Sequence, residues 1–271
     1  MPILYVVATP IGNLEDISLR ALRILREVKL IVAEDTRKTK RLLTAYEITT
    51  PMTSFHDHSG RGGVAKVLRR LEDGDVALVS EAGIPGISDP GHDLVGAAIE
   101  GGIEVVPVPG ASAVTSALAV SGLATDRFVY LGFLPAKASG RRRALAAAAG
   151  EAATLVVFEA PHRVAASLKD MLELLGDRKV AVCRELTKLH EEVFRGTLAT
   201  AVERFEAPRG EFTIVIEGKP DGGRPQLTEG IEQRLAEFRQ SGKPAREAVA
   251  AVSGETGLSR RELYRAWLRL G

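Results

Sequence analysis

The sequence predicts an α/β protein with two α/β domains and a C-terminal helical module. Short apolar runs alternate with segments of helical periodicity through most of the chain, and strands separated by helices favour parallel pairing. Three turns rich in glycine and proline directly follow apolar runs, the position where open α/β sheets bind ligands. A Gly- and Pro-containing stretch at 219–227 then reads as a linker. The predicted domains are residues 1–123, 124–218 and 219–271.

The first domain opens with the apolar run ILYVVA at 3–8, which is typical of a buried strand. The next helix carries apolar residues at helical spacing, and either Asp16 or Ser18 can serve as its N-cap. The same alternation then continues along the domain. It predicts strands at 30–33, 76–79 and 103–106 and helices at 63–72, 91–100 and 111–121.

The second domain follows a connection through 124–136, which contains Gly132 and Pro135. Its predicted strands lie at 128–131, 154–158, 179–183 and 212–216, and its helices lie in an Ala-rich segment, near 163–175 and near 197–205. The tail has helical patterns at 228–240, 244–253 and 259–270. A short turn at 254–257 and an N-cap at Ser259 give its last two helices a helix-turn-helix outline.

The composition indicates an ordinary globular protein, with 45% hydrophobic and 26% charged residues. A formal net charge of +1 means that any surface for nucleic acid must be local. Cys183 is the single cysteine, which excludes an intramolecular disulfide and fits a reducing compartment. No stretch reaches the ~18 apolar residues of a membrane helix, and no basic region precedes the first apolar run. We therefore expect a cytoplasmic protein with no membrane segment.

The three strand-end turns are the strongest candidates for a ligand site. The segment SEAGIPGISDPG at 80–91 combines three glycines with two prolines, so its backbone can approach a ligand while its shape is held. The turns Thr9–Asn13 and Pro107–Ser112 follow two other strands. The first turn is not GxGxxG, and GxxxxGK[ST] occurs nowhere in the chain, which excludes a P-loop. The first turn therefore suits a flat, adenosine-sized group better than a diphosphate.

Several motifs together resemble one family, the tetrapyrrole-methylase-like S-adenosylmethionine methyltransferases, and within it the branch that acts on small-subunit ribosomal RNA. These motifs are LYVVATPIGNLEDIS, AEDTR, SEAGIPGISDPG, PVPGAS, FVYLGFLP, FEAPHR and GEFTIVIEG. The resemblance covers essentially the whole chain. It implies a cofactor cleft between the two α/β domains, usually in a homodimer. It also implies methylation of a cytidine ribose 2′-hydroxyl in 16S ribosomal RNA, free or within the small subunit.

Matching of motif positions places S-adenosylmethionine against the three turns and one segment of the second domain. The implied cofactor-binding residues are Pro10, Ile11, Gly12, Ala82, Gly83, Pro85, Ser112, Ala113, Phe158 and Glu159. Glu81 departs from the branch, which more often has Asp at this position. Whether this longer carboxylate has a direct role stays open.

A ribose hydroxyl is a weak acid, so a base or a cation beside it would assist methyl transfer. The segment after the predicted strand at 179–183 offers both kinds of group. Glu185 is the candidate proton acceptor, and Lys188 or Arg184 is the candidate to hold a phosphate or to lower the pKa of the hydroxyl. A salt-bridged strand end is the alternative interpretation of this segment.

Local basic groups are the candidates for RNA contacts, because phosphate contacts position a strand without reading its sequence. The predicted RNA-binding residues are Arg37, Lys38, Lys137, Arg141, Arg142, Arg143, His162, Arg163, Arg184, Arg261 and Arg265. We expect the segment 137–143 to be a loop. Solvated charge runs, a helix terminus and an amphipathic last helix are the alternative interpretations of these groups.

Two other functions stay open from the sequence. One is a methyltransferase of a tetrapyrrole or diphthine-type substrate, and the other is a non-catalytic assembly factor that binds the ribosome. His56-Asp57-His58 is a weak metal motif, because its two histidines lack a third partner in the sequence. We therefore expect no metal.

Overall fold

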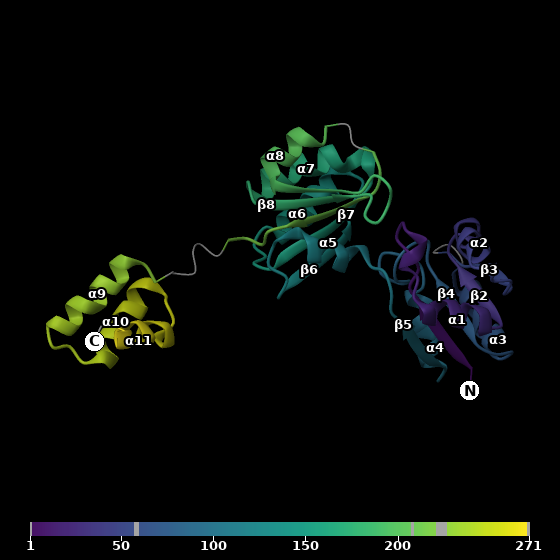
Figure 1. Cartoon of the computed structure of the whole chain (residues 1–271), viewed down its shortest axis with the longest axis horizontal. Coiled ribbons are helices and arrows are strands. Elements are labelled where there is room, and N and C mark those ends of the chain that lie inside the picture. Colours follow the sequence, from purple (N-terminus) through teal and green to yellow (C-terminus); the bar gives the residue numbers. More distant parts are fainter. Residues whose placement is uncertain (1, 57–59, 207–208, 221–226, 270–271) are drawn as a thin grey trace. The chain divides into compact units, whose positions relative to one another are not determined.

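A computed structural model describes residues 2–56, 60–206, 209–220 and 227–269 (Figure 1). The chain forms two compact units, Met1–Lys219 and Pro220–Gly271. The larger unit contains two five-stranded sheets. The described residues of the smaller unit form three helices. No helix in the described ranges has the length and apolarity needed to cross a membrane.

The first sheet is entirely parallel, with strand order β3-β2-β4-β1-β5. Its strands are β1 (Ile3–Val7), β2 (Leu30–Ala33), β3 (Met52–Ser54), β4 (Val76–Val79) and β5 (Glu104–Val108). The helices α1 (Leu19–Glu27) and α2 (Thr36–Ala45) contribute to the core on one face, and α3 (Gly60–Leu71) and α4 (His92–Glu100) to the core on the other. A parallel sheet buried on both faces explains the continuous apolar runs in the sequence.

The second sheet is mixed, with order β6-β7-β10-β8-β9. Strands β6 (Phe128–Phe133) and β7 (Thr154–Glu159) pair in parallel. The other three pairs are antiparallel and involve β8 (Lys179–Arg184), β9 (Glu192–Thr197) and β10 (Phe212–Ile216). One face carries α6 (Ala138–Ala148), α7 (Pro161–Leu175) and α8 (Leu198–Arg204). The other face is covered by α5 (Ala113–Ser121), which directly follows the first sheet in the chain.

Several elements differ from the sequence-based expectation. The segment 137–143 is not a loop, because residues 138–148 form α6, whose Arg, Ala and Leu residues are strong helix formers. Strands β3 and β9 and helix α2 were not predicted, since the short strands alternate weakly and α2 is rich in charge. Ser18, rather than Asp16, caps α1 by accepting a hydrogen bond from the Ala21 amide.

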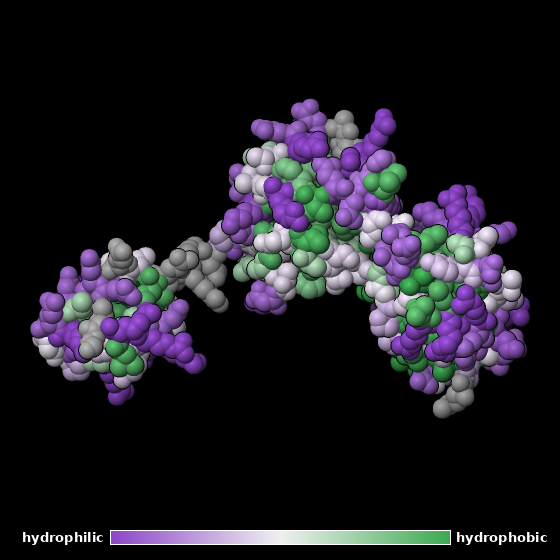
Figure 2. Space-filling view, viewed as in Figure 1, coloured by the Kyte–Doolittle hydropathy of each residue, from purple (hydrophilic) through white to green (hydrophobic). Residues whose placement is uncertain are grey.

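The smaller unit packs α9 (Glu229–Gln240), α10 (Ala245–Thr256) and α11 (Arg260–Arg269) around one apolar core that includes Leu235 and Trp267. The predicted turn at 254–257 is wrong, because α10 continues to Thr256 and ends at the left-handed Gly257. Ser259 Oγ accepts from the Glu262 amide at the start of α11. The face of this unit seen in Figure 2 is largely hydrophilic.

Candidate functional site

Three strand-end turns of the first sheet converge on Gly83. The Thr9 amide donates to the Gly83 carbonyl at 2.8 Å, and the Gly83 amide donates back to the Thr9 carbonyl at 3.0 Å. Gly83 has φ +80°, and a Cβ there would lie 3.6 Å from Ile11 Cγ2 and 3.7 Å from the Ala111 carbonyl oxygen. Residues from all three turns therefore meet at one glycine, as expected for parallel strands that end at a common edge.

A cavity of about 390 Å³ opens beside Gly83, between the turns of the first sheet and strand ends of the second. This volume lies within the roughly 300–1,000 Å³ that is usual for cofactor sites. Its lining includes Ile11, Ala82, Gly83, Ser112, Ala113, Phe158 and Glu159 among the predicted cofactor residues. Pro10, Gly12 and Pro85 are not among the lining residues, although each lies in a turn that supplies some of them. Pro85 is buried.

Gly12 instead gives room to a loop of the second α/β domain. A Cβ at Gly12 would overlap the Lys188 side chain and lie 2.7 Å from Thr187 Oγ1. The amide of Asn13 donates to the same Thr187 oxygen at 3.0 Å. Leu186 of this loop lines the cavity. The first turn and the loop after β8 therefore contact each other at one side of the cavity.

Glu159 is a buried carboxylate whose oxygens already have partners. Ser167 Oγ donates to Oε2 at 2.5 Å, and the Ala160 amide donates to Oε1 at 2.9 Å. Arg163 Nε lies 2.9 Å from Oε1, an ion pair whose angle does not make it a hydrogen bond. Arg163 also donates to the Leu134 carbonyl. This set of contacts fixes the start of α7 against the ends of β6 and β7.

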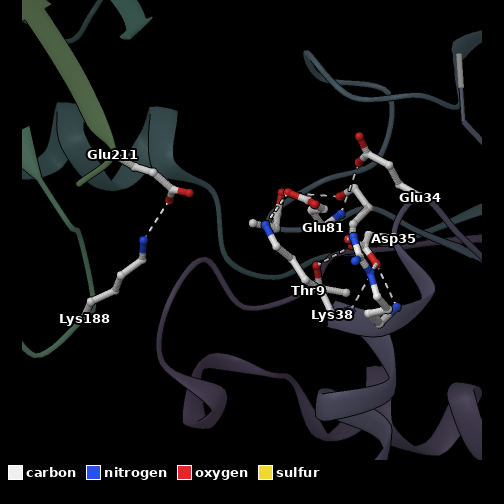
Figure 3. A network of polar contacts seen from close by, with 10 residues as sticks. Thr9, Glu34, Asp35, Lys38, Glu81, Lys188 and Glu211 are labelled. Carbon is white, nitrogen blue, oxygen red and sulfur yellow. Dashed lines mark hydrogen bonds and ion pairs between the residues drawn. The ribbon is translucent and has the colours of Figure 1, made fainter. Parts of the chain in front are cut away.

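Two lysine–glutamate pairs place charge at the cavity (Figure 3). Lys38 Nζ lies 2.5 Å from Glu81 Oε2, and Lys188 Nζ lies 2.9 Å from Glu211 Oε2. Glu81 and Glu211 both line the cavity. One pair comes from the first α/β domain and the other from the second. The cavity rim therefore presents paired, partly exposed charges from both domains.

The ion pair between Lys38 and Glu81 is linked by hydrogen bonds to the AEDTR segment at 33–37. The Glu81 amide donates to Glu34 Oε2 at 3.3 Å. Asp35 caps α2 by accepting from the Arg37 and Lys38 amides at 2.7 and 3.4 Å. Hydrogen bonds from Arg37 lower the pKa of Asp35 below its usual value. This segment therefore carries α2, and Lys38 with it, to the rim of the cavity.

Glu185 and Lys188 form a tight pair, but Glu185 is not among the lining residues. Glu185 Oε1 accepts from Lys188 Nζ at 2.8 Å and from the Glu211 amide at 2.8 Å. Burial raises the pKa of Glu185, but these hydrogen bonds outweigh burial, and the net pKa is lowered. For Lys188, burial lowers the pKa, but the hydrogen bonds to Glu185 and Glu211 raise it by more. The net pKa of Lys188 is therefore raised. Lys188 is therefore held as a cation.

The predicted RNA-binding residues fall into two groups. Six have carboxylate partners, and four of these six are buried or partly buried: Arg141 pairs with Asp170, Arg142 with Asp170 and Glu173, Arg163 with Glu159, and Arg184 with Glu192. The side chain of Arg141 is only 8% exposed. Arg37 and Lys38 are paired but exposed at 91% and 50%. The remaining residues are exposed, namely Lys137, Arg143, His162, Arg261 and Arg265.

The described part of the chain holds no group of three or more His, Cys, Asp or Glu side chains suited to a metal ion. Of the HDH motif, Asp57 and His58 lie outside the described residues. Cys183 lines the cavity, and burial raises the pKa of its thiol to about 11. This thiol is therefore protonated at neutral pH and acts as an apolar wall.

Sequence reasoning did not single out Phe133, Glu211 or Ser88 as part of the site, yet all three line the cavity. Phe133 lies in FVYLGFLP, Glu211 in GEFTIVIEG and Ser88 in SEAGIPGISDPG. The sequence motifs therefore include these three residues. Their positions at the cavity depend on the pairing of strands that are distant in the sequence, which the motifs do not specify. Alternation along β6 would have placed Phe133 on the same face as Val129 and Leu131, and the bulge between Tyr130 and Gly132 instead brings it to Phe158.

These features define the class of the protein: a two-sheet α/β enzyme with a mostly apolar ligand cavity at the carboxyl ends of parallel strands. The profile of the tetrapyrrole (corrin/porphyrin) methylases matches residues 3–202. The chain is 48% identical to a relative from Synechocystis sp. strain PCC 6803, over 100% of this chain and 99% of the relative. It is 50% identical to one from Thermotoga maritima, over 80% of this chain and 98% of the relative. Both relatives are named ribosomal RNA small subunit methyltransferase I.

Solved structures support the fold. Uroporphyrin-III C-methyltransferase from Thermus thermophilus superposes with a TM-score of 0.58 at 20% identity, covering 82% of this chain and 96% of that one. Diphthine synthase gives a TM-score of 0.59 at 15% identity, covering 79% and 90%. The protein belongs to the tetrapyrrole methylase family and is an S-adenosylmethionine-dependent methyltransferase.

The cavity fits this cofactor. Ile11, Gly83 and Phe158 give part of the cavity an apolar lining, which suits an adenosyl group. Ser112 and Ala113 begin α5, whose N-terminus favours a carboxylate. Asp89 supplies an acidic group that suits a ligand with cationic centres, whereas Glu81 is ion-paired with Lys38. The prediction of the cofactor and of the enzyme class is thereby confirmed.

Proposed function

We propose that this protein transfers a methyl group to the 2′-hydroxyl of a cytidine ribose in small-subunit ribosomal RNA. The observation that carries the proposal is the cavity at Gly83, together with relatives 44–50% identical that bear the name ribosomal RNA small subunit methyltransferase I. The similarity to uroporphyrin and diphthine enzymes is limited to 15–20% identity. A ribosomal substrate is therefore preferred to a tetrapyrrole or diphthine one. The proposal places the enzyme in the cytoplasm.

When bound, the cofactor would supply an electrophilic methyl group, whose carbon the ribose oxygen would attack in line with the C–S bond while S-adenosylhomocysteine leaves as the neutral thioether. The chain contributes alignment, because a well-oriented displacement avoids much of the entropic cost of bringing reactants together. Ile11, Gly83 and Phe158 fix one reactant between the two α/β domains. Lys188, held as a cation beside Glu211, is the proposed contact for a phosphate of the RNA. Glu185 receives two hydrogen bonds and is proposed to hold Lys188 in place, rather than to accept the proton.

The proposal also includes a homodimer. Large apolar side chains are exposed on the larger unit, among them Leu19 at 86% and Leu189 at 93%. A second copy is one way to cover such residues. Light scattering should give twice the monomer mass in solution, and a monomer mass at micromolar concentration would contradict this part.

The methyl acceptor can be identified directly. The protein is incubated with S-adenosylmethionine labelled in its methyl group and with small ribosomal subunits that lack ribose methylation. We expect label in RNA, at a 2′-O-methylcytidine after nuclease digestion. Label in subunit protein or in an added tetrapyrrole would contradict the proposed acceptor. Binding to subunits without any transfer would favour the assembly-factor alternative.

Lys188→Met should weaken use of the subunit without changing cofactor binding, because it removes one charge and keeps the length of the side chain. We expect the KM for subunits to rise several-fold and the slope of log affinity against log salt to fall by about 1. Lys169→Met, on the exposed side of α7, is the matched control and should change neither quantity. An unchanged salt slope in Lys188→Met would remove Lys188 from the RNA surface.

A further inference from the structure

The loop 81–91, termed here the wall loop, contains one residue whose backbone conformation is unusual. Gly83, Gly86 and Gly91 adopt φ of +80°, +81° and +136°, which glycine accepts at little cost. Ser88 adopts φ +61° although it has a side chain. A non-glycine residue in this region costs about 1–2 kcal/mol, and such strain persists where surrounding contacts hold it. The Ser88 side chain therefore needs a compensating contact.

That contact is a hydrogen bond between the wall loop and β6. Ser88 Oγ lies 2.7 Å from the Tyr130 hydroxyl of β6, and either oxygen can be the donor. Ser88 lies in a turn of the first sheet, and Tyr130 lies in the second sheet. The two residues are 42 positions apart in the chain. One side-chain bond thus joins the wall loop to β6, whose Phe133 also lines the cavity.

The backbone of β6 is shaped to receive Ser88. The register of β6 against β7 shifts between Tyr130 and Gly132, which marks a bulge. Gly132 has φ +65°, and a Cβ there would lie 3.1 Å from Ser88 Oγ, closer than ordinary contact. A bulge of this kind re-aims side chains next to functional sites. Glycine at 132 leaves the space that the serine hydroxyl fills.

Tyr130 in turn supports the aromatic wall of the cavity. Its ring meets Phe158 edge to face with centroids 5.1 Å apart, and Phe158 meets Phe133 at 5.5 Å. Phe133 and Phe158 both line the cavity, as does Ser88. A displacement of Ser88 or Tyr130 should therefore shift the wall loop and the aromatic side chains of Phe133 and Phe158. Burial raises the pKa of the Tyr130 hydroxyl, so it stays protonated and able to donate at neutral pH.

We propose that Ser88 and Tyr130 are positioning residues, whose hydrogen bond latches the wall loop to β6 and thereby sets the affinity for S-adenosylmethionine. Without the bond, the wall loop must be ordered when the cofactor binds, and that ordering reduces affinity. The proposal rests on the cofactor cavity and does not depend on which molecule accepts the methyl group.

The test measures cofactor binding by isothermal titration calorimetry, with S-adenosylmethionine and with S-adenosylhomocysteine as probes. Ser88→Ala and Tyr130→Phe should each weaken binding about 5- to 10-fold, the equivalent of one hydrogen bond. The double variant should bind no more weakly than either single variant, since both remove the same bond. Tyr46→Phe is the matched control, because the Tyr46 hydroxyl donates to the Leu14 carbonyl at 2.6 Å and Tyr46 does not line the cavity.

Ser88→Gly separates the bond from the strain, because glycine relieves the positive φ and also lacks the hydroxyl. We expect it to bind weakly, as Ser88→Ala does, while it unfolds at an equal or higher temperature than the native chain. Native-like affinity in Ser88→Gly, or additive losses in the double variant, would overturn the latch. So would variants that change only the melting temperature. Failure of the native chain to bind either probe would overturn the cofactor assignment itself, whereas label in the wrong acceptor would leave the latch intact.

Discussion

Gly83→Val should abolish useful cofactor binding. Valine is β-branched and fits poorly at φ +80°, and its branches would extend toward Ile11 and the Ala111 carbonyl, which already lie 3.6 and 3.7 Å from an added Cβ. Backbone strain and overpacking together cost about 3 kcal/mol. Because Gly83 lines the cavity, the cofactor-binding conformation bears this cost, and the affinity for S-adenosylmethionine should drop roughly 100-fold. Calorimetric titration measures this loss.

Gly102→Val is the matched control for Gly83→Val. Gly102 has φ +71°, and a Cβ there would have no atom within 4 Å. It therefore carries the same backbone penalty at a distance from the cavity, and it should lower stability without changing cofactor affinity. Gly83→Val should still associate with ribosomal subunits, because the exposed basic residues are untouched. Native affinity in Gly83→Val would mean that the three turns do not form the cofactor site.

Glu159→Ala should produce the largest loss of stability, because it removes the carboxylate beside a mostly buried arginine. The Arg163 side chain is 18% exposed and that of Glu159 is fully buried. Breaking such a pair from one side typically costs about 3–5 kcal/mol. For a unit of this size the melting temperature should fall by roughly 10 °C. Differential scanning calorimetry provides the measurement.

A second pair of variants distinguishes the buried pair from a direct cofactor contact. Glu159→Leu combined with Arg163→Leu removes both charges and should recover most of the lost stability. Glu159→Gln keeps the shape and an acceptor for Ser167, and should lie between the two. If the melting temperature of Glu159→Ala stays within ~2 °C of native while cofactor affinity collapses, Glu159 is a ligand group and not a support for α7.

The sequence predicted the parts of this site that depend on local composition. The three glycine- and proline-rich turns indicate close backbone approach to a ligand, whereas the choice of Ile11 and Gly83 within them came from the resemblance to the family. The parallel first sheet followed from the alternation of strands and helices. The antiparallel pairs of the second sheet could not be predicted in the same way. Strand direction there depends on pairings such as β7 with β10, which no local pattern encodes.

Side-chain partners were the least predictable feature, and the reason is distance along the chain. Lys38 and Glu81 are 43 residues apart, and neither segment alone indicates the other. Arg141 was predicted to contact RNA phosphates because it lies in a local run of basic residues. The structure instead turns it inward to Asp170, 29 residues away. The Glu159–Arg163 pair, at i,i+4, was within reach of sequence reasoning through helical spacing.

The passage from β5 into α5 has a mechanical consequence. The chain leaves the first sheet at Val108, and α5 then packs against the second sheet through Val114, Ala117 and Leu118. Ser112 and Ala113 line the cavity, and they lie where the chain passes from the first sheet to the helix that packs on the second sheet. The cavity therefore lies at the connection between the two sheets. A rotation of one sheet relative to the other would move Ser112 and Ala113 and would thereby change the shape of the cavity.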